Sequence, residues 1–251
     1  MKEFEGKYEG IVPSKILDKD NQTELDNFFL MLGVIFNDLK GLLFFSNLLK
    51  NTYRPLSKEE SVGQTTSAHL GEFSGLNLQI SRLIIGLISE FILFLRENEK
   101  VLNHPRFKLF EKQLDKKMKK PWSEILTITF SKDTSSQDFL SKVARVRGNI
   151  VFHYSKSRKE IPASFLKKFN EEKKTSANQK AYYSIGSRME DTRFYYCDAA
   201  VQEYLKEHLT IDPGQSHFSD IVAIVENMNQ AIAGLLHQYI SYKKQLKYLL
   251  T

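Results

Sequence analysis

The residues best suited to chemistry in this sequence are an arginine and a histidine six residues apart, Arg147 and His153. An imidazole has its ordinary pKa near neutrality, so it can accept or donate a proton at physiological pH. A guanidinium can hold a phosphate through two parallel hydrogen bonds and stabilise charge as it develops. Asn149 lies four residues before His153, the spacing at which two helical side chains meet, and its amide can orient the imidazole. The set suits phosphodiester chemistry.

These residues must be positioned by one helix, which we predict over about Gln137 to Tyr154 and which a capping box at Ser135 and Asp138 opens. At 100° per residue, a buried stripe forms within about 40° of Ile150. Its other members are Phe139, Val143, Val146 and Tyr154. Arg147 and His153 fall about 60° to either side of Ile150, so they flank the stripe rather than face solvent.

Structural roles for the same side chains stay open. Arg147 can extend its head group to solvent, or pair with a carboxylate such as Glu90 from a neighbouring helix. His153 fits a helix C-terminus, where the helix dipole favours a cation, and Asn149 fits a solvated helix end. Together on one helix, followed by basic residues, they favour a site that handles phosphate. The nearby cations are Arg145, Lys156, Arg158 and Lys159.

The segment VRGNIVFHYS, residues 146–155, resembles the signature of the HEPN superfamily: an arginine, four to six residues, then a histidine, late in a long helix of an all-α bundle. The resemblance implies a metal-independent endoribonuclease without cofactors, in which a homodimer joins two arginine–histidine pairs in one cleft. Arg147 and His153 would then be catalytic and Asn149 and Tyr154 supporting, with Arg145, Lys156, Arg158 and Lys159 binding RNA. The implied products carry a 2′,3′-cyclic phosphate and a 5′-hydroxyl.

The resemblance also implies a biological setting, that of a toxin or phage-defence component with an antitoxin protein as partner. A second interpretation stays open because Gly148 stands where active members usually carry Asn, Asp or His. It is a catalytically silent HEPN-like module that binds nucleotide or RNA, or only mediates dimerisation. A third is an all-α protein unrelated to that superfamily.

Composition sets the broad class of the protein. The 251 residues are 41% apolar and 26% charged, as in an ordinary globular protein. The net charge of +6 favours anionic partners such as RNA, although many basic proteins bind no nucleic acid. Cys197 is the single cysteine, which excludes an internal disulfide framework and a cysteine-rich zinc site and fits a reducing compartment. The remaining histidines are scattered, so no metal site is expected.

We expect a cytoplasmic protein without a membrane segment. The N-terminus has no apolar run of the kind found in secretory signals. The most apolar window, Leu83 to Leu95, is shorter than the roughly 20 residues that span a bilayer and contains Glu90. We therefore predict that it is part of a core helix. Cys197 is predicted to be a small buried side chain.

Helical spacing dominates the rest of the chain. We predict one all-α domain over residues 1–251, an antiparallel bundle of long helices elaborated after about residue 155, with a small irregular or hairpin insertion around 175–195. Other expected helices cover Leu25 to Leu49, Thr66 to Asn98, Pro105 to Lys120, a short lysine-rich stretch from Pro162, Thr192 to Leu209, and Ser219 to Leu249.

Helix-breaking residues set several of the predicted helix boundaries. Pro121 is expected to close the helix that Pro105 opens, and residues 52–66 and Pro213-Gly214 are expected to be a loop and a turn. The stretch ILTITF, residues 125–130, is compatible with a strand or with a helical end. Gly71, Gly75 and Gly86 are either weak points or sites of close packing.

Overall fold

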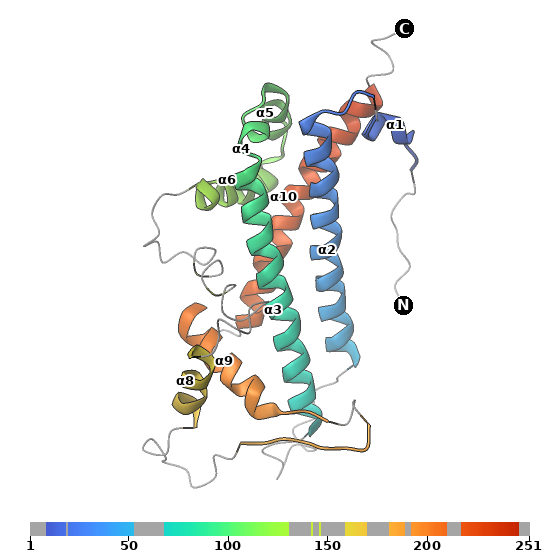
Figure 1. Cartoon of the computed structure of the whole chain (residues 1–251). Coiled ribbons are helices and arrows are strands. Elements are labelled where there is room, and N and C mark those ends of the chain that lie inside the picture. Colours follow the sequence, from blue (N-terminus) through green and yellow to red (C-terminus); the bar gives the residue numbers. More distant parts are fainter. Residues whose placement is uncertain are drawn as a thin grey trace.

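The computed structural model describes residues 9–18, 20–52, 68–130, 142, 146, 159–169, 181–188, 192–209 and 217–245. Across these residues the fold is all-α, as predicted, and the one β-type pairing is an isolated antiparallel bridge between Ser184 and Arg193. The helices are α1 (Pro13–Ile16), α2 (Glu24–Thr52), α3 (Ala68–Glu97), α4 (Glu99–Leu102), α5 (Pro105–Lys112), α6 (Lys116–Phe130), α8 (Glu160–Lys168), α9 (Tyr195–Leu209) and α10 (His217–Gln245) (Figure 1).

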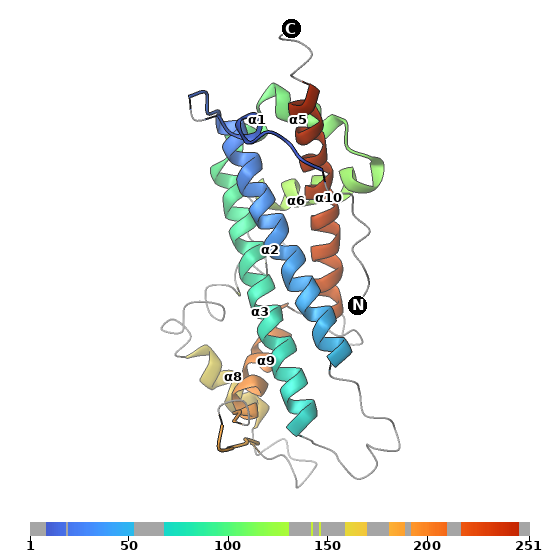
Figure 2. The same ribbon diagram turned by 90° about the vertical axis from the view of Figure 1, so that its right-hand side faces the viewer.

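Three long helices form the body of the molecule. Figures 1 and 2 show α2 running down the bundle, with α3 returning beside it and α10 running in the same direction as α3. α10 contacts both α2 and α3 and also packs against α6, which crosses the bundle towards its upper end. α8 and α9 pack together at the lower end, where α9 contacts α3.

Helix α2 shows why these segments are helical. Its inward side chains recur every three or four residues, which puts one face of the helix into the core. The buried apolar residues are Leu25, Phe28, Phe29, Leu32, Ile35 and Leu39. The backbone N–H of Asp26 donates to the Thr23 hydroxyl at 3.1 Å, which satisfies one of the free donors at the helix start.

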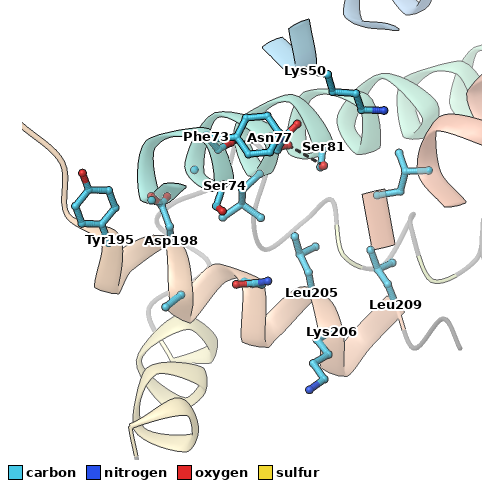
Figure 3. A pocket seen from close by; sticks show the side chains of 16 residues that line it. Lys50, Phe73, Ser74, Asn77, Ser81, Tyr195, Asp198, Leu205, Lys206 and Leu209 are labelled. Atoms are coloured by element: carbon cyan, nitrogen blue, oxygen red, sulfur yellow. Dashed lines mark hydrogen bonds between the residues drawn. The ribbon is translucent and has the colours of Figure 1, made fainter. Parts of the chain in front are cut away.

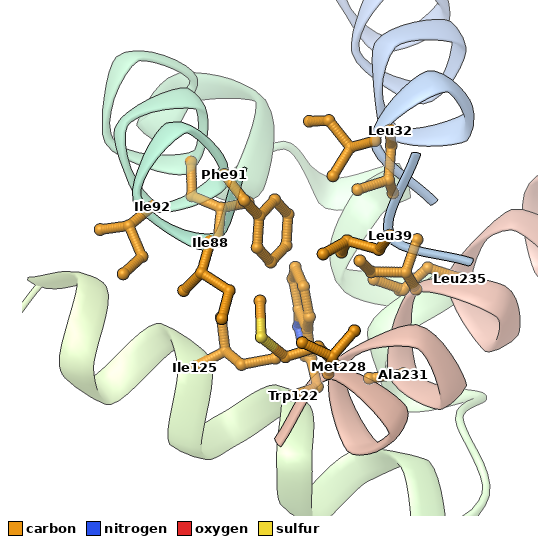
Figure 4. Packing of buried hydrophobic residues seen from close by; sticks show 14 of the residues in the cluster. Leu32, Leu39, Ile88, Phe91, Ile92, Trp122, Ile125, Met228, Ala231 and Leu235 are labelled. Atoms are coloured by element: carbon orange, nitrogen blue, oxygen red, sulfur yellow. The ribbon is translucent and has the colours of Figure 1, made fainter. Parts of the chain in front are cut away.

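The core lies between α2, α3, α6 and α10. Figure 4 shows Phe91 of α3 and Trp122 of α6 in the centre of the core, beside Leu39 of α2 and Leu235 of α10. All four side chains are fully buried. The Trp122 indole N–H donates to Glu111 Oε1 at 3.1 Å, so the ring contributes its apolar area to the core without leaving a donor unpaired.

The predicted helix from Pro105 to Lys120 is wrong in its second half. α5 ends at Lys112, and a new helix, α6, begins at Lys116 and contains Pro121 instead of ending there. Burial explains the continuation, because Trp122, Ile125 and Thr129 form a buried stripe on α6 and hold it in the core. The ambiguous ILTITF stretch is therefore the end of a helix.

The other element predictions that fall on described residues are largely confirmed. Leu25 to Leu49 lies within α2, and α3 covers Ala68–Glu97 of the helix predicted over Thr66 to Asn98. The short helix predicted from Pro162 begins at Glu160, and the terminal helix is described as far as Gln245. The Ser184–Arg193 bridge gives the predicted hairpin its one described pairing. Residues 53–67 and the Pro213-Gly214 turn lie outside the described residues.

Candidate functional site

Most residues of the predicted arginine–histidine site lie outside the part of the chain that the structure describes: Arg145, Arg147, Asn149, His153, Tyr154, Lys156 and Arg158. Two of their neighbours on the predicted helix are described. Lys142 and Val146 are both helical, and Val146 is 1% exposed within the main apolar cluster. The predicted buried stripe is thus confirmed at Val146, the residue that directly precedes Arg147. Lys159 is exposed and comes directly before α8.

Glu90, named as a possible partner for Arg147, is exposed on α3 because that position faces away from the side that packs into the core, and since Arg147 lies outside the described residues the pairing stays a prediction. One prediction about a single side chain is wrong. Cys197 was expected to be buried, but it is exposed. The buried side chains of α9 begin only at Ala200, so the first turn of that helix, which carries Cys197, stays outside the core.

The most elaborate polar arrangement in the described chain centres on Arg193, just before α9. Its guanidinium donates to Glu72 Oε1 of α3 through one terminal nitrogen and to Asp198 Oδ2 of α9 through Nε, each at 2.8 Å. The Arg193 side chain is only 12% exposed. Burial lowers the pKa of Arg193, but the hydrogen bonds and negative charges of Asp198 and Glu72 outweigh it, and the net shift is upward.

Two glycines of α3 make room for this arrangement. A Cβ on Gly75 would overlap the Arg193 guanidinium, and a Cβ on Gly71 would lie 2.5 Å from the ring of Tyr195. The pair is spaced four residues apart, so both positions lie on one face of α3. They are close-packing sites, the second of the two roles that the sequence allowed.

Beside this ion-pair cluster lies a cavity of about 750 Å³ between the first half of α3 and α9. Figure 3 shows Asn77 and Ser81 of α3 across the cavity from Leu205 and Leu209 of α9. Its remaining lining includes Phe73, Leu78 and Tyr195, with Lys50 and Lys206 among the charged residues. The volume falls in the range of small-molecule sites, about 300–1,000 Å³.

Among the described residues, the side-chain oxygen of Asn77 in the cavity wall has no hydrogen-bond partner. The Asn77 amide nitrogen donates to the Phe73 carbonyl at 3.0 Å, which orients the side chain, while Asn77 Oδ1 is buried and accepts no hydrogen bond from the described chain. A buried acceptor without a donor is costly, which makes this oxygen a natural contact for a ligand with an N–H or O–H group.

The sequence carried little signal for this region. Arg193 and Glu72 are 121 residues apart, and no local pattern relates them. Gly71 and Gly75 were the available hint, since two glycines four residues apart on a helix invite close approach. Among the described residues no group of three or more His, Cys, Asp or Glu side chains is arranged to hold a metal ion.

Comparison with known proteins adds no relationship. No family model, no curated protein and no solved structure matches the chain.

Proposed function

We propose that this protein is a HEPN-like, metal-independent endoribonuclease of the cytoplasm, acting as a homodimer with Arg147 and His153 as its catalytic residues. The observation that supports the proposal is the burial of Val146 in a helical position. Val146 is one member of the predicted buried stripe, and its burial agrees with that stripe. The same helical spacing predicts that Arg147 lies at the edge of a core-facing helix surface.

The chemistry follows from the residue types. His153 removes the proton from a ribose 2′-hydroxyl, and the resulting oxygen attacks the adjacent phosphorus. The bond from phosphorus to the 5′-oxygen breaks, and that oxygen receives a proton from the second histidine of the dimer. Arg147 holds the phosphate and stabilises the added negative charge in the transition state. The products are a 2′,3′-cyclic phosphate and a 5′-hydroxyl.

The test is cleavage of RNA by the full chain in the presence of EDTA. We expect His153→Ala and Arg147→Ala to lower the rate by about 10²–10⁴-fold, the usual contribution of a proton-transfer or charge-stabilising group. His237→Ala is the matched control, because His237 is exposed on α10 and has no role in the proposal. Equal cleavage by all three variants would refute the assignment. Growth arrest on expression, relieved by the first two changes, would support a toxin with an antitoxin partner or a phage-defence role.

A second candidate function is a silent module that binds a nucleotide or RNA without cleaving it. The cavity between α3 and α9 favours it, because Asn77 Oδ1 offers an acceptor beside apolar walls and lysines. This function would be supported if the chain cleaves no RNA but binds adenosine monophosphate, and if both salt and Asn77→Leu weaken that binding. No binding by the wild-type chain would reject it.

A further inference from the structure

The outer side of α2 and the adjoining side of α3 carry an apolar surface that the described chain leaves uncovered. Its large side chains are between 36% and 59% exposed: Leu30, Met31, Val34, Phe44, Phe45, Leu48, Leu83 and Leu93. We call this set the α2–α3 face. Single exposed apolar residues are ordinary on a soluble protein, but a set of this size on two adjoining helices marks an interaction surface.

The face is a regular feature of α2. With Leu39 pointing into the core, Leu30, Val34, Phe44 and Leu48 all fall within about 40° of the outward direction. The stripe from Leu30 to Leu48 is about 27 Å long at the rise of an α-helix. A second apolar stripe opposite the core stripe is what a helix needs when it is covered on two sides.

A groove of about 410 Å³ crosses the face between the two helices. Its lining includes Gly41 and Gly86, the apolar side chains of Phe45 and Leu83, and the exposed carboxylate of Asp38. Nothing lies within 4 Å of the place where a Cβ on Gly41 would stand. The missing side chain at Gly41 leaves space into which an apolar side chain from another molecule can descend.

A lipid bilayer is the other environment for such a surface. By length and composition alone, α2 and residues Gly71–Glu97 of α3 are long and apolar enough to cross a membrane. Asp38, however, is exposed at the middle of α2, and Glu90 is exposed on α3. α10 contacts both helices and exposes Glu226 and His237. Spanning would put these groups at membrane depth, where ionisable side chains are costly, so the face fits a protein partner better.

We propose that the occupant of the α2–α3 face is a second copy of this chain, related by a two-fold axis. The exposed apolar side chains offer roughly 600 Å², with a fully exposed aromatic side chain taken as about 200 Å². This area reaches the lower end of the range for specific interfaces, which bury about 600–1,000 Å² per partner. In a two-fold contact the same patch is used twice, so Phe45 of each copy meets the groove of the other.

The interface rests on the proposed function only for the homodimer that both require: a dimer that cleaves no RNA would overturn the nuclease alone, and a dimer unaffected by Phe45→Glu would overturn this interface alone. The test is sedimentation of the full chain over a wide concentration range. We expect the wild-type chain to dimerise and Phe45→Glu to raise the dimer dissociation constant at least about 30-fold, as for a dominant interface residue. Leu166→Glu is the matched control, because Leu166 is 68% exposed on α8 and lies outside the face.

A second variant separates pairing from folding. Gly41→Gln puts a polar side chain into the groove while favouring the helix, so it should weaken dimerisation without lowering the melting temperature of the monomer. A wild-type chain that stays monomeric, or a Phe45→Glu dimer as tight as that of Leu166→Glu, would overturn the proposal. So would a monomer that floats with phosphatidylcholine vesicles, because a membrane would then cover the face.

Discussion

At the upper end of the bundle Phe29 packs among Phe28, Phe107, Phe110 and Tyr239, with ring centroids 4.3–5.9 Å apart. At the lower end α9 meets α3 through the two ion pairs of Arg193, and α8 meets α9 through an exposed pair, Lys167 with Glu207 at 2.6 Å. The first end is joined by apolar area, which salt affects little. The second adds these ion pairs to the apolar contacts of Tyr204, Leu205 and Leu209, and salt and pH weaken ion pairs that lie near the surface.

The difference suggests a division of roles. A large shared core unfolds as one unit, whereas a helix that adds few side chains to that core can open by itself at lower cost. α9 adds Tyr204, Leu205 and Leu209 to the core. The cavity of the second candidate function lies at this ion-paired end, between α3 and α9. We therefore expect changes in the upper core to alter global stability and changes around Arg193 to alter the position of α9.

The largest expected effect is the loss of an upper-core ring. Phe29→Ala should lower the free energy of unfolding by about 3–5 kcal/mol, because Phe29 is 1% exposed and its removal leaves a cavity. Leu109→Ala, at a half-exposed position of α5, should change it by no more than about 0.5 kcal/mol. Urea denaturation measures both, and similar losses from the two changes would contradict the picture of a concentrated core.

The next effect concerns the ion-paired end. Gly75→Ala should cost about 1–3 kcal/mol, because its Cβ overlaps the Arg193 guanidinium and forces that side chain away from Glu72 and Asp198. Gly33→Ala is the matched helical change, since its Cβ would meet only Leu236 Cδ2 at 3.8 Å, and it should stabilise by up to about 1 kcal/mol. Hydrogen exchange should show faster α9 amides in the first variant. Unchanged α9 protection would show that Arg193 does not hold the helix.

The smallest expected change in stability concerns a polar contact at the upper end of the bundle, that of the Tyr239 hydroxyl. The Tyr239 hydroxyl lies 2.9 Å from Asp26 Oδ1 and 3.0 Å from the Ile16 carbonyl oxygen. Tyr239→Phe should cost about 1 kcal/mol at neutral pH. Burial first, and then the hydrogen bond to Asp26, raises the pKa of Tyr239 in the folded state.

The sign of the pH dependence follows from that raised pKa. The unfolded tyrosine ionises near pH 10 while the folded one keeps its proton, so the contribution of Tyr239 is present below about pH 10 and is lost above it. The difference in unfolding free energy between wild type and Tyr239→Phe should therefore shrink as pH rises past 10. A constant difference would show that the phenol is not protected by folding.

The helices could be predicted from the sequence because their signal is local. The inward residues of α2 and α3 recur every three or four positions, and that spacing needs no knowledge of the partner. The prediction that Pro121 ends a helix was wrong because the helix-breaking tendency of proline competes with the burial of Trp122 and Ile125. That burial exists only in the assembled core. The prediction that Cys197 is buried was wrong because α9 begins several residues before its first buried side chain.

The candidate sites divide in the same way. Arg147 and His153 could be singled out by residue type and spacing, and the burial of Val146 supports the predicted face of their helix. The Arg193 cluster could not be predicted, because its three charges come from segments that meet only through the path of the chain. The apolar residues of the exposed side of α2 can be read from the sequence, but their lack of a cover within the described chain is a property of the fold.

The parallel course of α3 and α10 has a consequence for synthesis. Some 120 residues separate the end of α3 at Glu97 from the start of α10 at His217. At roughly 5–20 residues per second, the ribosome needs about 6–24 s to cover that distance. During this interval the paired α2 and α3 present their inner apolar face, which α10 later covers, as well as the outer one. The nascent chain is thus most exposed to aggregation before its last long helix emerges.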